Sequence, residues 1–283
     1  MRAFGDRREQ VPFLEKRAHK IKRAMLLVML ACSCSKHPEK DLLPLLLLYQ
    51  SPTFNQSSQG PSCHDQSLPG SGDSRPAPLN VLIVAGQSNS VGLGERTTQG
   101  VIQNVVTWTG TRWETYRPSS CFGPEQGFLD AWSSDHQNEI LGLVKHAHGG
   151  SGMADWQVNW TEQEAYDPTN GQLNAELLAM YQDAGSLPVV ALLWNQGETD
   201  AAIPGMAVKY EQRLKEFSIQ WQTRFIVGVT SEKNTCCLDI IRTAQRKYEH
   251  IETEDLTTWA DGIHFDTQAQ LTMGARFYQR FKE

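Results

Sequence analysis

The residues best suited to chemistry are a serine and an Asp-x-x-His pair that lie far apart in the sequence. Ser88 stands in a Gly-Gln-Ser-Asn turn, and Asp261 precedes His264 by three residues. This spacing lets the carboxylate hold one imidazole nitrogen while the other nitrogen faces the serine. A serine hydroxyl is a poor nucleophile at neutral pH without such a base. These residues together predict nucleophilic catalysis by Ser88.

Two other segments could bind the negative charge that develops on an ester oxygen. The paired glycines Gly149 and Gly150 expose backbone N–H groups to a substrate, and Gln196 carries an amide donor. Each motif taken singly has an ordinary alternative. Ser88 could be a turn or helix-capping residue, and the glycines could form a flexible turn.

Two acidic residues, Glu198 and Asp200, follow Gln196 closely. They could form the carboxylate pair of a glycosidase, which requires a defined separation in space. They could instead be loop acids that cap the next helix and hold neighbouring loops. We favour the structural role for both residues.

The elements that must position these residues alternate along the chain. Apolar runs typical of buried parallel strands occur at residues 81–85, 140–144, 189–194, 225–229 and 256–259. Helical stripes occur between or after them, at residues 173–184, 207–221, 238–248 and 269–281, and Pro124 begins another helix. The alternation predicts an α/β fold, a three-layer α/β/α sandwich with a doubly wound, mainly parallel five-stranded sheet. Every motif above follows a predicted strand, where such sheets bind ligands.

The ordered set of motifs resembles the SGNH hydrolases, and within them the sialate O-acetylesterase-like carbohydrate esterases of family 6. The matching segments are residues 86–89, 122–125, 149–151, 194–200 and 261–264, and the resemblance covers about residues 79–283. It implies a flavodoxin-like fold and a carbohydrate esterase that removes O-acetyl groups from sugars or glycans through a serine acyl-enzyme. It implies no metal and no cofactor.

The resemblance also assigns roles to single residues. Ser88 matches the nucleophile, His264 the base and Asp261 the acid that orients the base. The oxyanion donors fall on the N–H of Ser88, the N–H of Gly150 (or Gly149) and the Gln196 side chain. Other positions that could bind substrate or support loops are Gln87, Asn89, Gly149, Trp156, Glu198 and Asp200.

Several positions leave the shape of the pocket open. Ser90 and Ser151 replace residues that are more common in the family, and we expect both to affect pocket shape rather than chemistry. Trp156, Trp160 and Trp194 could stack on a sugar ring or pack in the core. Two rival functions also stay open: a general short-chain or lipid esterase of the GDSL/SGNH type, and a glycan-binding relative that has lost turnover.

The charge of the chain is unevenly distributed. Its formal net charge is -6, of which residues 1–80 contribute +4 (11 Lys/Arg, 7 Asp/Glu) and residues 81–283 contribute -10 (15 Lys/Arg, 25 Asp/Glu). An acidic body argues against broad nucleic-acid binding, because phosphates require basic patches. It is compatible with a neutral substrate such as an acylated sugar.

The region before residue 79 differs from the rest. Residues 1–50 form a basic leader whose apolar runs, 24–31 and 42–49, are too short to span a bilayer, and residues 51–78 form a Ser/Gly/Pro-rich linker. A basic start followed by a short apolar run favours export, and the alternative is an intracellular protein with a disordered extension. We expect free or buried cysteines, with a disulfide at Cys121 as the alternative in an exported protein.

Overall fold

The computed structural model describes residues 70–95, 100–119, 121–231 and 235–283. An eight-stranded sheet in these residues has the order β1-β5-β4-β7-β2-β8-β9-β10. Its strands are β1 (Ser74–Arg75), β2 (Asn80–Gly86), β4 (Ile102–Trp108), β5 (Trp113–Tyr116), β7 (Leu141–Ala147), β8 (Val189–Asn195), β9 (Phe225–Gly228) and β10 (Glu249–Ile251). The pairings from β4 through β10 are parallel, and β1 and β5 add antiparallel strands at one edge. A separate small sheet pairs β3 (Gly94–Glu95) with β6 (Cys121–Phe122).

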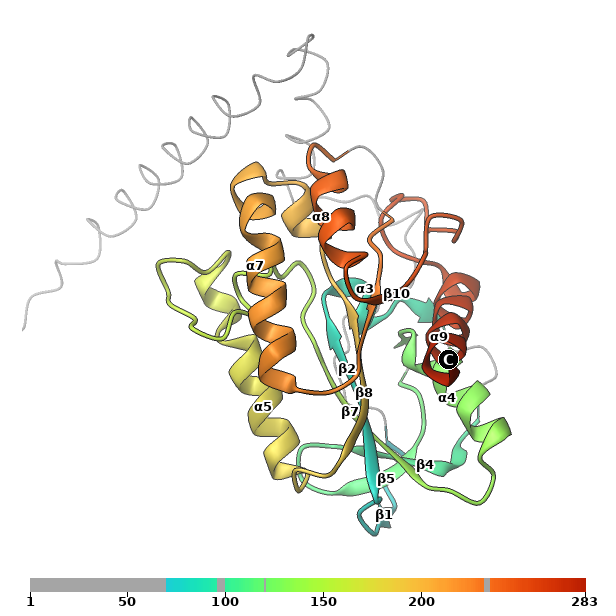
Figure 1. Cartoon of the computed structure of the whole chain (residues 1–283). Helices are drawn as coiled ribbons and strands as arrows, with labels where there is room; N and C mark the ends of the chain where they lie inside the picture. Colours follow the sequence, from blue (N-terminus) through green and yellow to red (C-terminus); the bar gives the residue numbers. More distant parts are fainter. Residues whose placement is uncertain (1–69, 96–99, 120, 232–234) are drawn as a thin grey trace, which may run out of the picture. The chain divides into compact units, whose positions relative to one another are not determined.

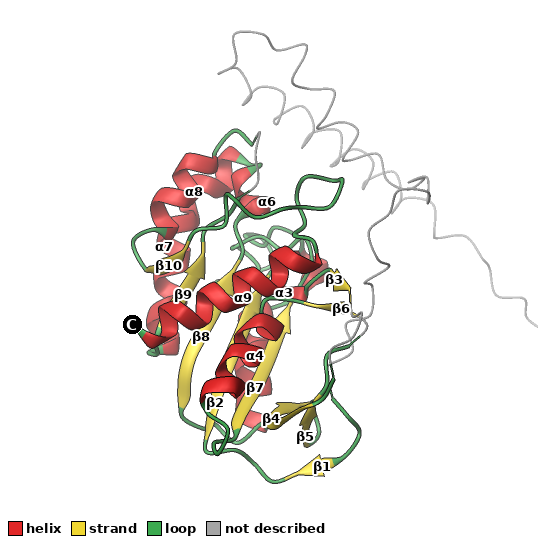
Figure 2. Ribbon diagram, turned by 90° about the vertical axis from the view of Figure 1, so that its right-hand side faces the viewer, coloured by secondary structure: helices red, strands yellow, loops and turns green. Residues whose placement is uncertain are grey.

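Helices cover both faces of the sheet and make three layers. Figure 1 views the sheet nearly edge-on, with α5 (Leu173–Asp183), α7 (Pro204–Trp221) and α8 (Leu238–Gln245) on one side. The helices α4 (Glu125–Asp135) and α9 (Thr267–Lys282) lie across the other face (Figure 2). Alternate residues of β2 supply the two cores: Val81 and Ile83 pack with the first group of helices, and Leu82 and Val84 with the second.

The position of β2 determines where a ligand can bind. β2 pairs with β7 on one side and with β8 on the other, so later strands of the chain are added on both sides of β2. The crevice outside the carboxyl ends of such strands is the usual ligand site of a doubly wound sheet. The short helices α3 (Ser88–Val91) and α6 (Glu198–Ala201) begin within three residues of the ends of β2 and β8.

The helices α4 and α9 pack unusually closely, because glycines replace larger side chains at their contact. A Cβ on Gly274 would lie 2.1 Å from the carbonyl oxygen of Pro124, and a Cβ on Gly127 would lie 2.1 Å from that of Leu271. Any larger residue would therefore have to separate the two helices. This contact fixes α9, which begins at Thr267, three residues after His264.

The predicted α/β fold class is confirmed, and the predicted sheet is too small. Four of the five predicted strands correspond to β2, β7, β8 and β9, but residues 256–259 form no strand, and Thr258 makes only an isolated bridge with Phe265. The last parallel strand is β10 instead. The β4–β5 hairpin was not predicted.

The predicted leader, residues 1–50, lies outside the described residues, as does most of the predicted linker, residues 51–78. Within the described part of that linker, Ser74–Arg75 forms the edge strand β1 and pairs with β5. The sheet therefore begins inside the segment that composition marked as a linker.

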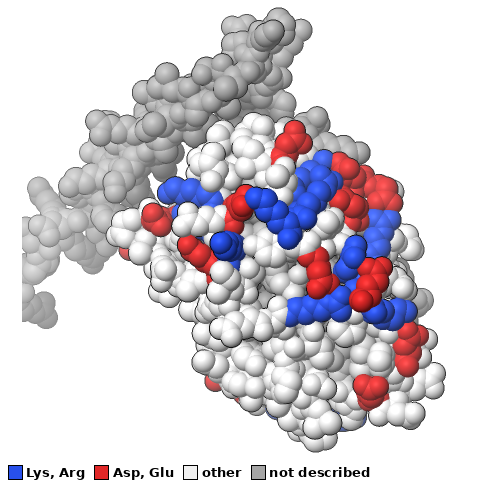
Figure 3. Space-filling model, viewed as in Figure 1, with Lys and Arg blue, Asp and Glu red and all other residues white. Residues whose placement is uncertain are grey.

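The charged surface is mixed on the face seen in Figure 3, where basic and acidic side chains lie beside one another. Arg242 pairs with Glu254, and Lys247 pairs with Glu211. In the part of the chain that the structure describes, no helix is both long enough and apolar enough to cross a membrane.

Candidate active site

Ser88 begins α3 immediately after β2, on a turn that requires glycine. Gly86 has a φ of 140°, and a Cβ there would lie 2.0 Å from the carbonyl oxygen of Asn195. The neighbouring strand β8, which ends at Asn195, thus approaches the turn too closely for any side chain at residue 86. Ser88 lies at the carboxyl edge of the sheet, because it follows the end of β2, and it is half-buried there.

The structure brings the serine, the histidine and the aspartate together. Ser88 Oγ lies 2.9 Å from Nε2 of His264, and Nδ1 of the same ring lies 2.7 Å from Asp261 Oδ2. Burial alone would raise the pKa of Asp261, but its hydrogen bonds with His264 and with the N–H of Ile263 outweigh burial and lower it to about 2. Asp261 therefore stays ionised at any ordinary pH. The arrangement can move a proton from the hydroxyl to the imidazole and stabilise the resulting cation.

Asn89 holds the loop that carries His264. Its Nδ2 donates to the carbonyl of Ile263 (3.3 Å), and its Oδ1 accepts from the N–H of Phe265 (3.0 Å). These two groups flank His264 in the chain. Nδ2 also donates to Oε1 of Glu198 (2.9 Å), which fixes the Asn89 amide. The residue after Ser88 therefore sets the distance between the hydroxyl and the imidazole.

Gln87 holds a different loop from the other side of Ser88. Its Oε1 accepts from the N–H groups of Gly197 (3.3 Å) and Thr199 (3.4 Å), and it lies 3.3 Å from Nε2 of Gln196. The two neighbours of Ser88 thus connect the end of β2 to two loops that are distant in sequence. Both residues act as loop supports in this structure.

Three backbone N–H groups, of Ser88 itself and of the loop that contains Gly149, are unpaired in the described part of the chain. The N–H groups of Ser88, Gly149 and Gly150 have no acceptor among the described residues. A Cβ placed on Gly149 would lie 3.9 Å from Cβ of Ser88, so this glycine lies beside the serine. Unpaired N–H groups beside a nucleophile can bind the oxyanion of an acyl-transfer reaction.

Gln196 has partners that conflict with its predicted role. It is fully buried, and its Nε2 donates to Asp200 Oδ2 (2.6 Å) and to the carbonyl of Ser151 (3.2 Å). An amide nitrogen has two hydrogens, so both are already used. As it stands, Gln196 has no hydrogen left for a substrate oxygen, and the prediction that it is an oxyanion donor disagrees with this geometry.

Asp200 is enclosed and holds this network together. Its Oδ2 also accepts from the N–H of Met153 (2.8 Å), and Oδ1 is buried without a partner among the described residues. Burial raises the pKa of Asp200 to about 6, although the hydrogen bonds from Gln196 and Met153 act in the opposite direction. The folded protein therefore keeps this proton at a pH where the unfolded chain has lost it.

The Asp200→Asn variant is expected to remove this pH dependence. As the pH rises from about 4 to about 6, the wild-type free energy of unfolding should fall. This group should contribute up to about 3 kcal/mol of the fall, because its folded pKa exceeds the unfolded value of 3.8. An asparagine oxygen can accept from the same two donors and does not titrate. Urea melts of both proteins at pH 4, 5, 6 and 7 measure the difference. Parallel stability profiles would show that Asp200 does not titrate in this range.

Glu198 is also buried, and its partner is Asn89 rather than a substrate. Burial raises its pKa, while the hydrogen bond from Asn89 lowers it. Only 5% of Glu198 and none of Asp200 is exposed to solvent. A glycosidase pair must reach both sides of a glycosidic bond. The buried positions instead agree with the loop-supporting role that we favoured from sequence.

Comparison with known proteins identifies the family of the chain. A family model described as "Carbohydrate esterase, sialic acid-specific acetylesterase" matches residues 78–283. The chain belongs to this family. Members of a carbohydrate esterase family hydrolyse ester bonds, so this esterase is a hydrolase that acts on esters. No curated protein shows a significant sequence match to the chain.

Solved structures share the fold of the esterase at low sequence identity. A protein from Arabidopsis thaliana superimposes with a TM-score of 0.62 at 18% identity, over 72% of this chain and 98% of that one. The protein NanS gives 0.54 at 14% identity, over 74% and 98% of the two chains. A carbohydrate acetylesterase from Xanthomonas citri gives 0.50 at 16% identity, over 71% and 55%. At these identities the likeness concerns the fold alone.

Two tryptophans of the esterase cannot stack on a sugar. Trp156 and Trp194 are fully buried and contact each other edge to face, with ring centroids 5.2 Å apart. The stacking interpretation is therefore wrong for these two residues, and the alternative of core packing holds. Trp160 is partly exposed.

The two unusual serines of the esterase are buried and support loops. Ser90 Oγ lies 3.0 Å from the carbonyl oxygen of Ala85 and 3.1 Å from that of Asn195, and these two acceptors share its one hydrogen. Ser151 Oγ donates to the carbonyl of His148 and accepts from the indole of Trp156. Neither residue is exposed, so the expectation that they shape the pocket is wrong.

Sequence reasoning missed Asp155, which organises the loop after the paired glycines. Its carboxylate accepts from the N–H groups of Gly152, Tyr166 and Asp167, and from the amide of Asn170. The side chain is completely buried. An acid between small and apolar residues was the only local signal, and it gives no partner.

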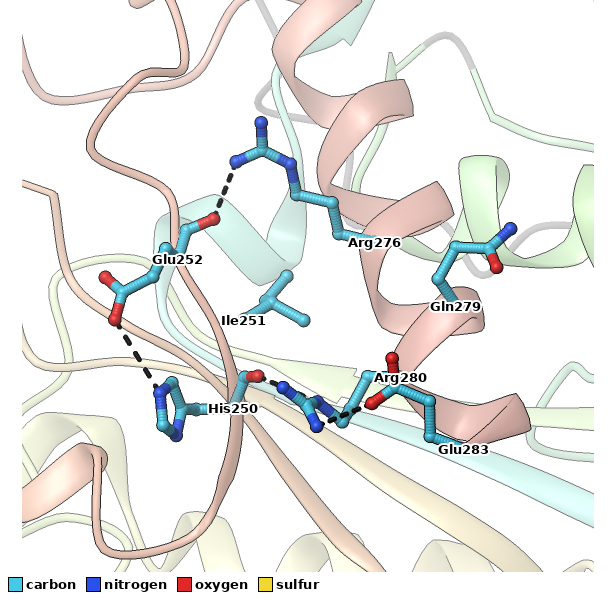
Figure 4. A pocket seen from close by; sticks show the side chains of 7 residues that line it. All are labelled: His250, Ile251, Glu252, Arg276, Gln279, Arg280 and Glu283. Carbon is cyan, nitrogen blue, oxygen red and sulfur yellow. Dashed lines mark hydrogen bonds and ion pairs between the residues drawn. The ribbon is translucent and has the colours of Figure 1, made fainter.

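A hollow on the surface of the esterase lies between β10 and α9 (Figure 4). Its arginines are already bound: Arg276 donates to Asp255 and to the carbonyl of Glu252, and Arg280 donates to Glu283. We assign no ligand to this hollow.

The described residues also contain no cluster of three or more His, Cys, Asp or Glu that could hold a metal ion.

Proposed function

We propose that the protein removes acyl groups, most simply acetyl, from the hydroxyls of a sugar or glycan through an acyl-enzyme on Ser88. The observation that carries the proposal is the unbroken contact from Ser88 Oγ through His264 to Asp261, at 2.9 and 2.7 Å. The acetyl group and the sugar are supported by the family description and by the Xanthomonas citri relative.

The first half of the reaction forms the acyl-enzyme. Ser88 Oγ attacks the ester carbonyl as its proton passes to Nε2 of His264, and the carbonyl oxygen takes the negative charge. Donors near Ser88 bind that charge, and Asp261 stabilises the imidazolium. The bond between carbonyl carbon and sugar oxygen then breaks, and the imidazolium gives its proton to the departing hydroxyl.

The second half regenerates the enzyme. A water molecule loses a proton to Nε2 of His264 and attacks the acyl carbon. The bond to Ser88 Oγ breaks, the oxygen recovers the proton from His264, and the product leaves as acetic acid, which ionises to acetate in water. The chain's own residues supply every proton transfer in this scheme.

The test is a set of ester substrates with the purified protein. We expect hydrolysis of p-nitrophenyl acetate and of acetylated sugars, slower hydrolysis of p-nitrophenyl octanoate, and labelling of Ser88 by a fluorophosphonate probe. Faster turnover of the octanoyl ester would favour the lipid-esterase alternative. Labelling without turnover of any ester would favour the glycan-binding relative, and failure to label Ser88 would contradict the serine mechanism.

We also propose that the protein is exported. Cys121 is disulfide-bonded, whereas Cys236 and Cys237 are free thiols. Disulfides form and persist mainly in oxidising compartments. The short apolar run in the leader supports the same proposal. Recovery of the protein from the cytosol with Cys121 reduced would contradict it.

A further inference from the structure

Cys236 and Cys237 are adjacent free thiols whose sulfur atoms lie against each other. The two Sγ atoms are 2.8 Å apart, and either thiol can donate to the other. Cys236 is exposed and Cys237 is buried, so an external reagent reaches one sulfur of the pair directly. No other cysteine of the described residues is a free thiol, and the proposed reaction at Ser88 uses neither member of the pair.

The pair lies where the beginning of α8 meets the end of α6. Cys237 is the N-cap residue of α8, and its N–H donates to the carbonyl of Ala201 (3.1 Å). Sγ of Cys236 lies 3.6 Å from the same carbonyl oxygen and 3.7 Å from that of Ala202. Because α6 also carries the buried Asp200, the two thiols contact a helix that belongs to the network behind the active site.

A bond between these neighbouring cysteines would be easy to reduce. The peptide bonds of the described residues are all trans, which places the two Cα atoms about 3.8 Å apart. Most disulfides join residues whose Cα atoms are about 4.4 to 6.8 Å apart, and a departure from this range stores strain. Strained or exposed disulfides are labile, whereas structural ones resist reduction. The pair is therefore suited to a bond that forms and breaks.

The protonation of Cys236 explains why such a bond needs an oxidant and does not form at once. Burial, together with the hydrogen bond and the charge of Cys237, raises the pKa of Cys236 to about 12. The thiolate is the form that attacks a disulfide, so a thiol that stays protonated at neutral pH reacts slowly. The free pair is therefore stable in the absence of an external disulfide.

We propose that Cys236 and Cys237 are a redox modification site, which forms a reversible disulfide by exchange with a small external disulfide such as oxidised glutathione. The thiolate of the exposed Cys236 attacks one sulfur of that disulfide, whose S–S bond breaks, and the departing thiolate takes up a proton. Cys237 then loses its proton, attacks Sγ of Cys236 and releases the second thiol. Two protein thiols are oxidised, and one external disulfide is reduced to two thiols. The bonded Cys236 has no hydrogen to donate to Ala201 or Ala202, so α6 loses that contact.

Mass spectrometry of the full chain tests the proposal, because trypsin cuts after Lys233 and Arg242 and releases both cysteines in one peptide. The protein is incubated with oxidised glutathione at about pH 8.5, near the ordinary pKa of cysteine, and the remaining thiols are then alkylated. We expect this peptide to lose two hydrogens and to carry no alkyl group. Dithiothreitol should restore both thiols at a lower concentration than the one that reduces the disulfide of Cys121.

Two single substitutions are the matched controls, because each leaves one thiol that cannot close the ring. Cys237→Ser should carry glutathione on the exposed Cys236, and Cys236→Ser should stay largely unmodified because its remaining thiol is buried. A wild-type peptide that is alkylated at both cysteines, or that stops at a glutathione adduct on Cys236, would overturn the proposal. Reduction of the pair only together with Cys121 would show that the bond is not labile, and loss of two hydrogens in either variant would assign the bond to another cysteine.

Discussion

The Ser88→Ala variant is expected to lose at least about 10⁴-fold in kcat for p-nitrophenyl acetate while keeping its fold. The hydroxyl is the atom that would form the acyl bond, and no other hydroxyl reaches Nε2 of His264 in the described residues. Among the described residues, the hydroxyl makes a hydrogen bond with that imidazole alone, so its removal should leave Tm within a few degrees. Steady-state rates and thermal melts of the two proteins measure both effects.

Ser90→Ala is the matched control for this prediction. It removes a hydroxyl two residues away, but the one hydrogen of that hydroxyl is shared by the buried carbonyls of Ala85 and Asn195. We expect a loss of stability of about 1 kcal/mol and continued labelling by a fluorophosphonate. Ser88→Ala should show the opposite pattern, with stability retained and labelling abolished. Labelling of the Ser88→Ala protein would show that another residue is the nucleophile.

The strands at the centre of the sheet were predictable because burial on both faces requires apolar residues at nearly every position. β2, β7 and β8 are buried over most of their length, so their sequences are continuous apolar runs. β10 lies at the sheet edge, has three residues and buries only Ile251 fully. The β4–β5 hairpin mixes polar and apolar residues at the opposite edge. Edge strands satisfy weaker constraints, and their sequences show weaker patterns.

The triad was predictable because its chemistry restricts both residue type and local spacing. Asp261 and His264 share one turn, and Ser88 follows a predicted strand. The partners of Gln196 were not predictable, because they depend on how α6 turns Asp200 back towards the amide. The burial of Trp156 depends likewise on how the loop after β7 packs against α7. Contacts of this kind arise from tertiary packing and have no local pattern.

The Asp261→Asn variant is expected to lower kcat about 10³- to 10⁴-fold, because the structure dictates how the new amide must lie. The N–H groups of Ile263 (2.9 Å) and His264 (3.0 Å) both donate to Oδ1 of Asp261. Backbone donors can be satisfied only by the amide oxygen of an asparagine. Its nitrogen must therefore take the place of Oδ2 and face Nδ1 of His264.

That orientation forces the imidazole into the wrong tautomer. An amide N–H requires an acceptor at Nδ1, so the ring proton moves to Nε2, the nitrogen that faces Ser88. A protonated Nε2 cannot accept the hydroxyl proton, and the acid that would stabilise an imidazolium is gone. The turn keeps both backbone hydrogen bonds, so Tm should change little.

Asp266→Asn is the control for this substitution, because it changes the same residue type five positions further on. Asp266 caps α9 by accepting from the N–H of Ala269 (2.9 Å), and asparagine is an equally good N-cap. We therefore expect wild-type kcat and Tm in this variant. An Asp261→Asn enzyme that retained kcat would show that the carboxylate does not set the tautomer of His264, and the proton path from Ser88 would then need another base.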